Sequence, residues 1–229
     1  MLAVAVSVID QNRSPKQLAR RALIIDAAVE TLKREGIAGC TVRAIAAATP
    51  FTKGTIHYYF SDVREIVNTA YLRLTDDYVA QVEAMAAVAA RRPVPAFWWA
   101  VGSYVEGFRH HRRMGLLWFE YSSWAVRNGY GHGVASSVQA VRSMFARRLD
   151  GIAVDAEWLA AALTRYLLGT VLELSVSTVD NRAVMAQVAR ICGLRPPRPE
   201  PTVATHATIC PVCRPGHASR EVWTSDQKS

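Results

Sequence analysis

Apolar residues recur every three or four positions over most of the chain, which is the spacing of amphipathic helices. The first such stripe consists of Leu18, Ala22, Ile25, Val29 and Leu32. It is preceded by Ser14-Pro15-Lys16-Gln17, which has the residue types of a capping box with proline at the first helical position. Gly36 stands where a left-handed cap would end the helix. The pattern therefore predicts a helix from Ser14 to Gly36.

Two short helices are predicted next. Thr41 can cap the first, whose inward face is Val42, Ile45 and Ala46, and Pro50 then interrupts the pattern. Thr52 can cap the second, which runs through Phe60 with Ile56 and Phe60 facing inward. Thr55, Tyr58 and Tyr59 are expected on its more open faces. Three helices within so short a stretch predict a helix-turn-helix.

The rest of the pattern is also helical and predicts an all-α fold. The expected helices span about residues 62–90, 97–110, 114–128, 134–149, 156–177 and 182–192. No segment alternates with period two for long enough to predict a sheet. After Leu194 the sequence is proline-rich and polar without apolar periodicity, so residues 195–229 are expected to be a disordered tail. Residues 1–13 are expected to be a disordered extension.

Composition narrows the class of protein. With 229 residues, 51% hydrophobic and 20% charged, the chain can bury a sizeable core. No apolar run approaches the roughly 20 residues that span a bilayer, and the first residues lack the features of a signal peptide. The four cysteines do not form a disulfide framework. We therefore expect a cytoplasmic protein with no membrane partner.

The net charge of +8 favours a polyanionic partner without locating its binding surface. From Asp10 to Phe60 there are eight Lys or Arg against four Asp or Glu. From Arg91 to Arg148 there are nine arginines against two glutamates. The basic excess is therefore not confined to the predicted helix-turn-helix.

The segment from Leu23 to Tyr71 resembles the TetR family of bacterial transcriptional repressors. The resemblance rests on Gly36, on Thr41-Val42-Arg43-Ala44-Ile45-Ala46 and on Lys53-Gly54-Thr55-Ile56-His57-Tyr58-Tyr59-Phe60 at fixed spacing. It implies an all-helical homodimer that binds a double-stranded DNA operator and is released by a small molecule bound in its C-terminal domain. The segment "GLLWFEYSSWAVRN" resembles the betaine-regulator-like branch of this family.

The resemblance also implies which residues contact DNA. By position, Thr41 and Arg43 would touch phosphates. Thr52, Lys53, Gly54, Thr55, His57 and Tyr58 would form the DNA-facing side of the next helix. These residue types suit a phosphate backbone, because hydroxyls and lysine bind phosphate and glycine permits close approach. The alternative is a purely structural helical hairpin.

Three departures from the family pattern bear on this interface. Pro50 stands where the family usually has glycine, so the turn is expected to be rebuilt. His57 stands where tyrosine is usual, and Tyr59 where histidine is usual. Val63 replaces a common phosphate-binding lysine, whose contact Arg64 could replace.

Aromatic residues are dense between Phe97 and Tyr130, and they either form plain core or line a ligand cavity. The predicted lining is Trp98, Tyr104, Phe108, Trp118, Tyr121 and Trp124, which would suit a largely apolar or aromatic effector. Glu106 and Glu120 are polar candidates for this cavity or solvated helix residues. "RHHRR", residues 109–113, could receive an anion or form a solvated loop between helices.

Assembly as a homodimer is expected to use residues 156–192. Their apolar residues include Leu159, Leu163, Tyr166, Leu167, Val171, Leu174 and Val188. Together these expectations give a DNA-binding domain over residues 14–60 and a ligand-binding and dimerisation domain over residues 61–194. The predicted function is a sequence-specific DNA-binding transcriptional regulator, a repressor released from its operator by a small-molecule ligand.

The tail supports an alternative function. His206, Cys210, Cys213 and His217 have a spacing that can hold a tetrahedral Zn²⁺, so a helical interaction or metal-sensing protein is the second candidate. The favoured interpretation assigns no metal and no cofactor. The motifs of nucleotide-binding loops, serine hydrolases and zinc peptidases are absent from the sequence, so we expect no catalytic residues.

Overall fold

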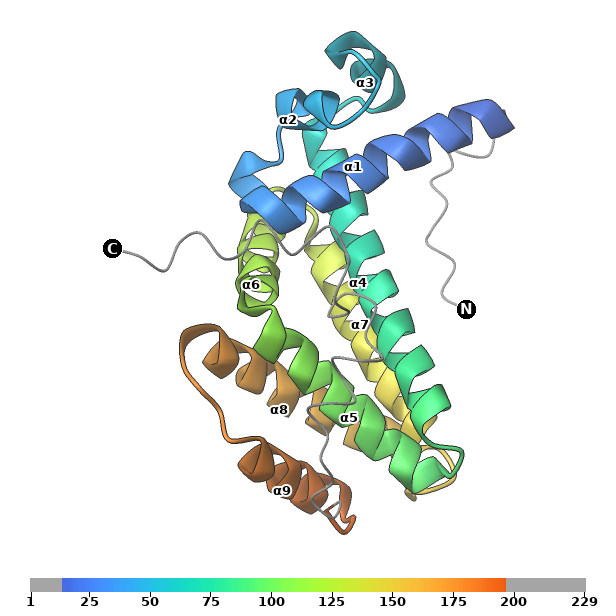
Figure 1. The fold of residues 1–229 in the computed structure, drawn as a ribbon, viewed down its shortest axis with the longest axis vertical. Coiled ribbons are helices and arrows are strands. Elements are labelled where there is room, and N and C mark those ends of the chain that lie inside the picture. The colour runs from blue at the N-terminus through green and yellow to red at the C-terminus, as the bar shows by residue number, and fades with distance from the viewer. Residues whose placement is uncertain (1–13, 197–229) are drawn as a thin grey trace. The chain divides into compact units, whose positions relative to one another are not determined.

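The computed structural model describes residues 14–196, which form nine α-helices and no strand (Figure 1). The predicted all-α fold with an N-terminal helix-turn-helix is confirmed. The predicted extension over residues 1–13 lies outside the described residues. So do almost all of the predicted tail and its arrangement of His206, Cys210, Cys213 and His217.

The first three helices begin at the predicted caps. In α1 (Pro15–Gly39), the Ser14 hydroxyl accepts from the Gln17 N–H at 3.3 Å, and Gln17 Oε1 accepts from the Ser14 N–H at 2.9 Å. Thr41 caps α2 (Val42–Ala47), and Thr52 caps α3 (Lys53–Tyr59). Gly36 has φ of 72° and ψ of −171°, so it interrupts α1 in a conformation that only glycine adopts readily.

The buried face of α1 differs from the predicted stripe. Ile25, Val29 and Leu32 are buried as expected, but Leu18 and Ala22 are exposed. Arg21 is buried instead, in line with Ile24, Ile25 and Ala28 at the next turns. The first turns of α1 thus contribute few apolar residues to the core. The side of the helix that is buried there contains Arg21, whereas Leu18 and Ala22 lie on the exposed side.

The turn between α2 and α3 is built without a left-handed residue. No non-glycine residue in the described part of the chain has a positive φ. Thr49 instead bridges Pro50, because its Oγ1 donates to the Ala46 carbonyl at 3.5 Å and accepts from the Phe51 N–H at 3.4 Å. A threonine side chain can replace backbone hydrogen bonds in this way, so the turn tolerates proline.

The remaining helices are α4 (Val63–Ala89), α5 (Pro93–His110), α6 (Arg112–Arg127), α7 (Gly131–Leu149), α8 (Ala156–Val176) and α9 (Asn181–Cys192). Helix α5 begins four residues before the predicted start, because prolines are tolerated in a first turn. The expected loop at residues 109–113 is wrong: Arg109 and His110 end α5, and Arg112 and Arg113 begin α6.

The described residues form two compact units. One contains residues 14–76 and 117–140, and the other contains residues 77–116 and 141–196. Helices α4, α6 and α7 contribute residues to both units. The predicted domain boundaries near residues 60 and 194 stay a prediction.

In the second unit α8 packs against α5 and α9. Its buried side chains are Ala160, Leu163, Thr164, Leu167, Thr170, Val171 and Leu174. Helix α8 is long and apolar enough in mean hydropathy to cross a membrane, and it is the one helix among residues 14–196 that meets both conditions. The sequence pattern did not reveal this, because Thr164, Arg165 and Thr170 interrupt every apolar run.

Candidate nucleic-acid interface

The eight residues predicted to contact DNA lie together on α2, α3 and their caps. All are exposed except Thr55, which is partly exposed. Thr41 Oγ1 accepts from the Ala44 N–H and Thr52 Oγ1 from the Thr55 N–H, both at 3.2 Å. A hydroxyl that accepts from the backbone keeps its own proton, so the Thr41 hydroxyl can also donate to a phosphate oxygen. The Thr52 and Thr55 hydroxyls share a hydrogen bond at 3.0 Å, which leaves one proton of this pair to donate.

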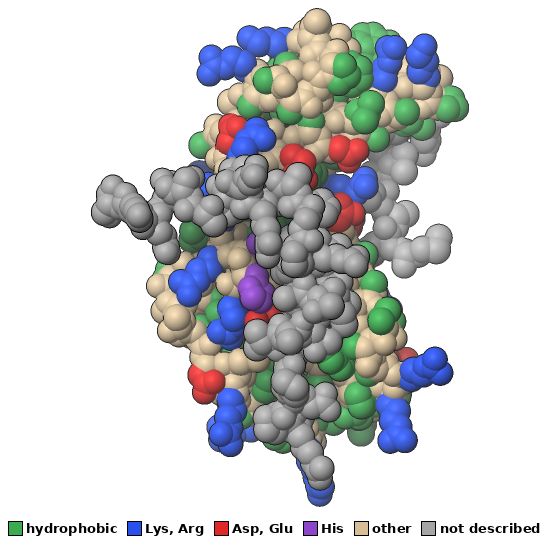
Figure 2. All heavy atoms as spheres, in the orientation of Figure 1, with side chains coloured by type: hydrophobic (Ala, Val, Ile, Leu, Met, Phe, Trp, Pro, Cys, Tyr) green, Lys and Arg blue, Asp and Glu red, His purple; other side chains and the backbone are tan. Residues whose placement is uncertain are grey.

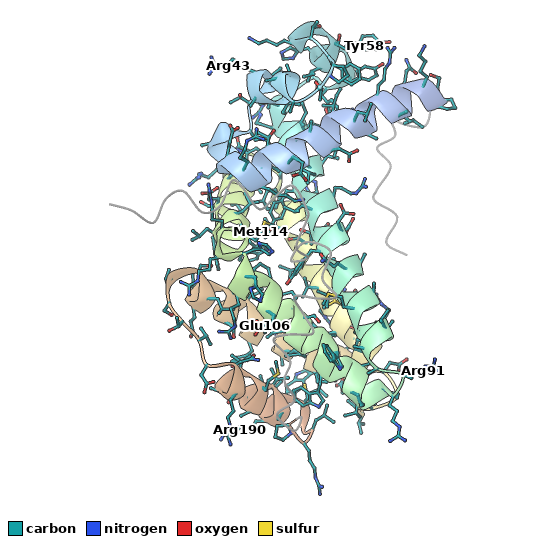
Figure 3. All side chains as sticks on the ribbon, in the orientation of Figure 1. Arg43, Tyr58, Arg91, Glu106, Met114 and Arg190 are labelled. Carbon is teal, nitrogen blue, oxygen red and sulfur yellow. The ribbon has the colours of Figure 1, made fainter. Side chains whose placement is uncertain are left out.

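The two tyrosines of α3 differ in exposure. Tyr58 is 67% exposed, whereas Tyr59 is 4% exposed, so the expectation that Tyr59 lies on an open face is wrong. Ile56, Tyr59 and Phe60 are spaced by three and four residues and share the buried face of the helix. Figure 3 shows Arg43 extending from α2 and Tyr58 beside α3.

Gly54 has no role in the packing of its own chain. A Cβ at this position would meet Thr52 Oγ1 at 3.8 Å, which is an ordinary contact, and the backbone φ is not positive. Glycine in a helix costs up to about 1 kcal/mol relative to alanine. No contact within the described chain requires glycine here, so this position leaves the backbone of α3 open to the approach of another molecule.

Arg21 connects α3 to α1 and α4. One guanidinium nitrogen donates to the Tyr59 carbonyl at 2.6 Å, and the other forms an ion pair with Glu65 at 2.5 Å. The guanidinium carbon also lies 3.8 Å from the centre of the Phe60 ring. The carbonyl is at the end of α3 and Glu65 is in the first turn of α4, so one buried side chain fixes the orientation of the exposed helix.

The electrostatic character of this surface is positive. No acidic residue occurs between Glu35 and Asp62, whereas Arg43, Lys53 and His57 fall in that segment and are exposed. Figure 2 shows Lys and Arg side chains where α2 and α3 lie. Such a surface attracts the phosphate backbone of a nucleic acid.

Arg64 lies beyond this segment and is already paired. Its Nε donates to Asp62 Oδ2 at 2.6 Å, and this hydrogen bond lowers the pKa of the Asp62 carboxyl. Val63 is partly exposed and offers no charge. A phosphate contact by Arg64 in place of the missing lysine stays a prediction.

Of the six aromatic residues predicted to bind a ligand, three lie in the second unit. Tyr104 is buried, and its ring contacts those of Phe108, Phe145 and Tyr78 at centroid distances of 5.2, 5.7 and 5.7 Å. Trp98 is buried against Phe97, and its Nε1 has no hydrogen-bond partner among the described residues.

The other three, Trp118, Tyr121 and Trp124, lie in the first unit. Tyr121 is fully buried; its ring stacks on Tyr71 at 3.7 Å and its hydroxyl donates to Asn68 at 2.8 Å. Trp124 stacks on Tyr130. The six residues are therefore divided between the two units, three in each, and a single cavity lined by all six stays a prediction.

The two glutamates named as polar candidates have different surroundings. Glu106 on α5 is 5% exposed, so it is not a solvated residue (Figure 3). It binds Arg109 Nε at 3.0 Å and lies 3.6 Å from His110 Nε2. Glu120 is exposed and accepts from the Ile37 N–H at 3.3 Å.

Among residues 14–196, no group of three His, Cys, Asp or Glu could hold a metal ion.

Sequence reasoning missed Arg21, Glu65 and Gln17. The signal for Arg21 was present, because it occurs three residues before Ile24 and four before Ile25, on the buried face of α1. The side chain of Gln17 belongs to the cap of α1, but its Nε2 also donates to the Tyr58 hydroxyl at 3.4 Å. No sequence pattern reveals a contact between residues 41 positions apart.

Comparison with known proteins agrees with this site. Residues 24–70 match the family described as "Bacterial regulatory proteins, tetR family", and no curated protein matches the chain. The match covers α2, α3 and parts of α1 and α4, the helices that build the candidate interface. The match shows similarity to that family over these helices, and nothing in it bears on the betaine-regulator-like branch.

Solved structures show the same fold. A Streptomyces coelicolor A3(2) protein described as a transcriptional regulator is 22% identical with a TM-score of 0.61, over 76% of this chain and 98% of that chain. A Pseudomonas aeruginosa PAO1 protein with the same description is 22% identical with a TM-score of 0.60, over 89% and 97%. The multidrug binding protein EbrR complexed with imidazole is 24% identical with a TM-score of 0.60, over 80% and 98%.

Proposed function

We propose that this protein is a transcriptional regulator that binds a DNA operator through α2 and α3, as a homodimer, and is released by a small molecule. The observation that carries the proposal is the exposed face of α3. It combines Lys53, a glycine without a packing role at Gly54, and a capping hydroxyl at Thr52. These groups supply charge, close approach and a hydrogen-bond donor to a phosphate backbone.

The buried side of the same helix supports this role. A helix that reads DNA must keep its orientation, and Arg21 ties the last residue of α3 to both neighbouring helices. The match of residues 24–70 to the tetR-family model covers these same elements. Regulators of this family bind operators, and on that basis we extend DNA binding to this chain.

The effector we propose is largely apolar or aromatic. The support is the aromatic content of α5 and α6, with Trp98, Tyr104 and Phe108 in one unit and Trp118, Tyr121 and Trp124 in the other. EbrR, which has a similar fold, has been solved in complex with malachite green. An effector releases DNA only by the amount that it prefers the released conformation, because equal affinity for both conformations shifts nothing.

Replacing Lys53 by alanine tests the DNA-binding surface. The probe is a duplex enriched from a randomised library by the wild-type protein. Since Lys53 is expected to bind a phosphate, Lys53→Ala should weaken this duplex and an unrelated duplex about equally. It should also reduce the slope of log K against log salt by about 0.9. Fluorescence anisotropy over a series of NaCl concentrations gives both quantities.

Lys33→Ala is the matched control, because Lys33 lies far along α1 and is paired with Glu30 at 2.8 Å. It should leave the affinity and the slope unchanged. Failure of the wild-type protein to enrich any duplex, or equal behaviour of the two alanine variants, would contradict DNA binding through α3.

A further inference from the structure

The start of α1 is joined to the exposed tyrosine of α3. Gln17 Nε2 donates to the Tyr58 hydroxyl at 3.4 Å, while Gln17 Oε1 accepts from the Ser14 N–H. A single side chain thus connects the first turn of α1 to a residue proposed to contact DNA. The surface formed by α2 and α3 therefore continues onto α1.

The part of α1 next to this contact is basic. Lys16 and Arg20 are exposed and four residues apart, so they lie on the same side of the helix. No acidic residue occurs between Ser14 and Ile25, and neither basic side chain has an ion-pair partner within residues 14–196. In Figure 2, Lys and Arg side chains are visible where α1 begins.

The other end of α1 provides a contrast. Lys33 is paired with Glu30, and Arg34 with Glu35, both at 2.8 Å. Lys16, in the first turn of α1, also opposes the helix macrodipole, which favours negative charge there. No ion pair within the described residues compensates the charge of Lys16 or of Arg20. An anionic partner would offset it.

We infer that the start of α1 is a second DNA-contacting element, in which Lys16 and Arg20 bind backbone phosphates beside those bound by α2 and α3. Gln17 is a positioning residue that holds the Tyr58 ring between the two elements. This inference rests on the proposed DNA binding. It adds to the interface a helix face outside the helix-turn-helix itself.

The test uses the full-length protein and the duplex enriched by the wild type. The double variant Lys16→Gln/Arg20→Gln should lower affinity and reduce the salt slope by about 1.8, the value expected for two phosphate contacts. The loss should be the same on an unrelated duplex, because phosphate contacts carry no sequence information. The matched control is Lys33→Gln/Arg34→Gln on the same helix, which should leave the slope unchanged.

The role of Gln17 is tested by a double-mutant cycle with Tyr58→Phe. If Gln17 acts by positioning Tyr58, Gln17→Ala should weaken the enriched duplex in the wild-type background and have no further effect in the Tyr58→Phe background. Loss of the capping box alone would lower thermal stability equally in both backgrounds. Additive effects on DNA affinity would therefore overturn the positioning role.

The outcomes distinguish a failure of the proposed DNA binding from a failure of the role of α1. If the wild type enriches no duplex, the proposed function fails and this inference fails with it. If Lys53→Ala weakens binding but the Lys16/Arg20 variant behaves like the Lys33/Arg34 variant, DNA binding stands and the role of α1 is overturned.

Discussion

Arg21 is the residue whose loss should do most damage to the helix-turn-helix. Its side chain is 10% exposed and binds the Tyr59 carbonyl, Glu65 and the face of Phe60. Removing one partner of a buried charged pair leaves the other without compensation. Glu65 is partly exposed, so water reduces this penalty, and Arg21→Met should lower the free energy of unfolding by about 1–3 kcal/mol.

Urea unfolding followed by circular dichroism measures this loss. Arg20→Met is the control, because Arg20 is exposed and adjacent, and its stability should change by less than about 0.5 kcal/mol. Equal stability of the two variants would show that the Arg21 contacts contribute nothing to the fold.

The buried thiols should be unreactive in the folded protein. Burial, with a contribution from Glu35, raises the pKa of Cys40 to about 12, and burial raises the pKa of Cys192 to about 11. At pH 8 the reactive thiolate of Cys40 is then a fraction on the order of 10⁻⁴. In a Cys210→Ser/Cys213→Ser background, iodoacetamide should label neither thiol until denaturant is added. Rapid labelling of the native protein would contradict their burial.

The raised pKa of Cys40 makes the free energy of unfolding depend on pH in the alkaline range. An unfolded Cys40 thiol ionises near its ordinary pKa of 9.0, whereas the folded thiol keeps its proton to about 12. The unfolded state therefore binds fewer protons above pH 9, and the free energy of unfolding falls as pH rises from about 9 to 12. Below pH 9 both states are protonated and this thiol contributes no pH dependence.

Residue types at helix starts were predictable, whereas residues that link helices were not. Ser14, Thr41 and Thr52 cap their helices as expected, since a cap depends on neighbours three residues away. Tyr59 was expected on an open face of its helix and is buried instead. Its burial depends on which side of the seven-residue helix α3 meets the rest of the unit, and that is decided by packing at long sequence distance.

At the scale of helices, α7 approaches α4 and α6 closely through Gly133. A Cβ at this position would lie 2.2 Å from the Tyr121 hydroxyl and 2.6 Å from Asn68 Oδ1. These atoms cannot move aside easily, because Tyr121 is fully buried, stacked on Tyr71 and hydrogen-bonded to Asn68. Gly133→Ala should therefore destabilise the protein by about 1–3 kcal/mol despite the better helix propensity of alanine.

Gly131 on the same helix is the matched control. A Cβ there would meet nothing within 4 Å, so Gly131→Ala should leave stability unchanged or raise it by up to about 1 kcal/mol. Thermal or urea unfolding of the two variants compares them directly. Stabilisation by Gly133→Ala would show that the three helices do not pack as closely as described.

Apolar periodicity predicted that these segments are helices, but it predicted less well where the helices begin and end. The helix expected from residue 97 begins at Pro93, because Pro93 and Pro95 lie in the first turn of α5, where the missing N–H costs nothing. Pro50 was expected to force a different turn. The structure shows how, through the two hydrogen bonds of Thr49, which the sequence contains but periodicity does not detect.

At the scale of the whole molecule, the residues expected to form a dimer interface are mostly core. Leu163, Leu167, Val171, Leu174 and Val188 are each at most 2% exposed within their own chain. The sequence pattern could not separate a buried face from an interface, because both are apolar. Glutamate at Leu163 or Leu167 would unfold the protein instead of dissociating it.

The opposite face of α8 is the better candidate for contact with a second copy. Trp158, Leu172 and Val176 are 63%, 48% and 74% exposed, and a Cβ on Gly169 between them would meet nothing within 4 Å. From Trp158 to Gly169, Leu172 and Val176 the steps are eleven, three and four positions, which places all four residues on one side of the helix. Small and apolar residues on one exposed face permit close packing of a second helix across a two-fold axis.

Leu172→Glu should therefore dissociate the homodimer without unfolding the chain, because Leu172 is already exposed and contributes little to the core. Sedimentation velocity should give a dimer for the wild type and a monomer for the variant, with similar thermal unfolding. The monomer should also bind the enriched duplex more weakly, since it contacts one half-site where the dimer contacts two. Val88→Glu is the control, because Val88 is 77% exposed on α4 and should tolerate the charge. A monomeric wild type, or a Leu172→Glu variant that stays dimeric, would rule out this face of α8 as the interface.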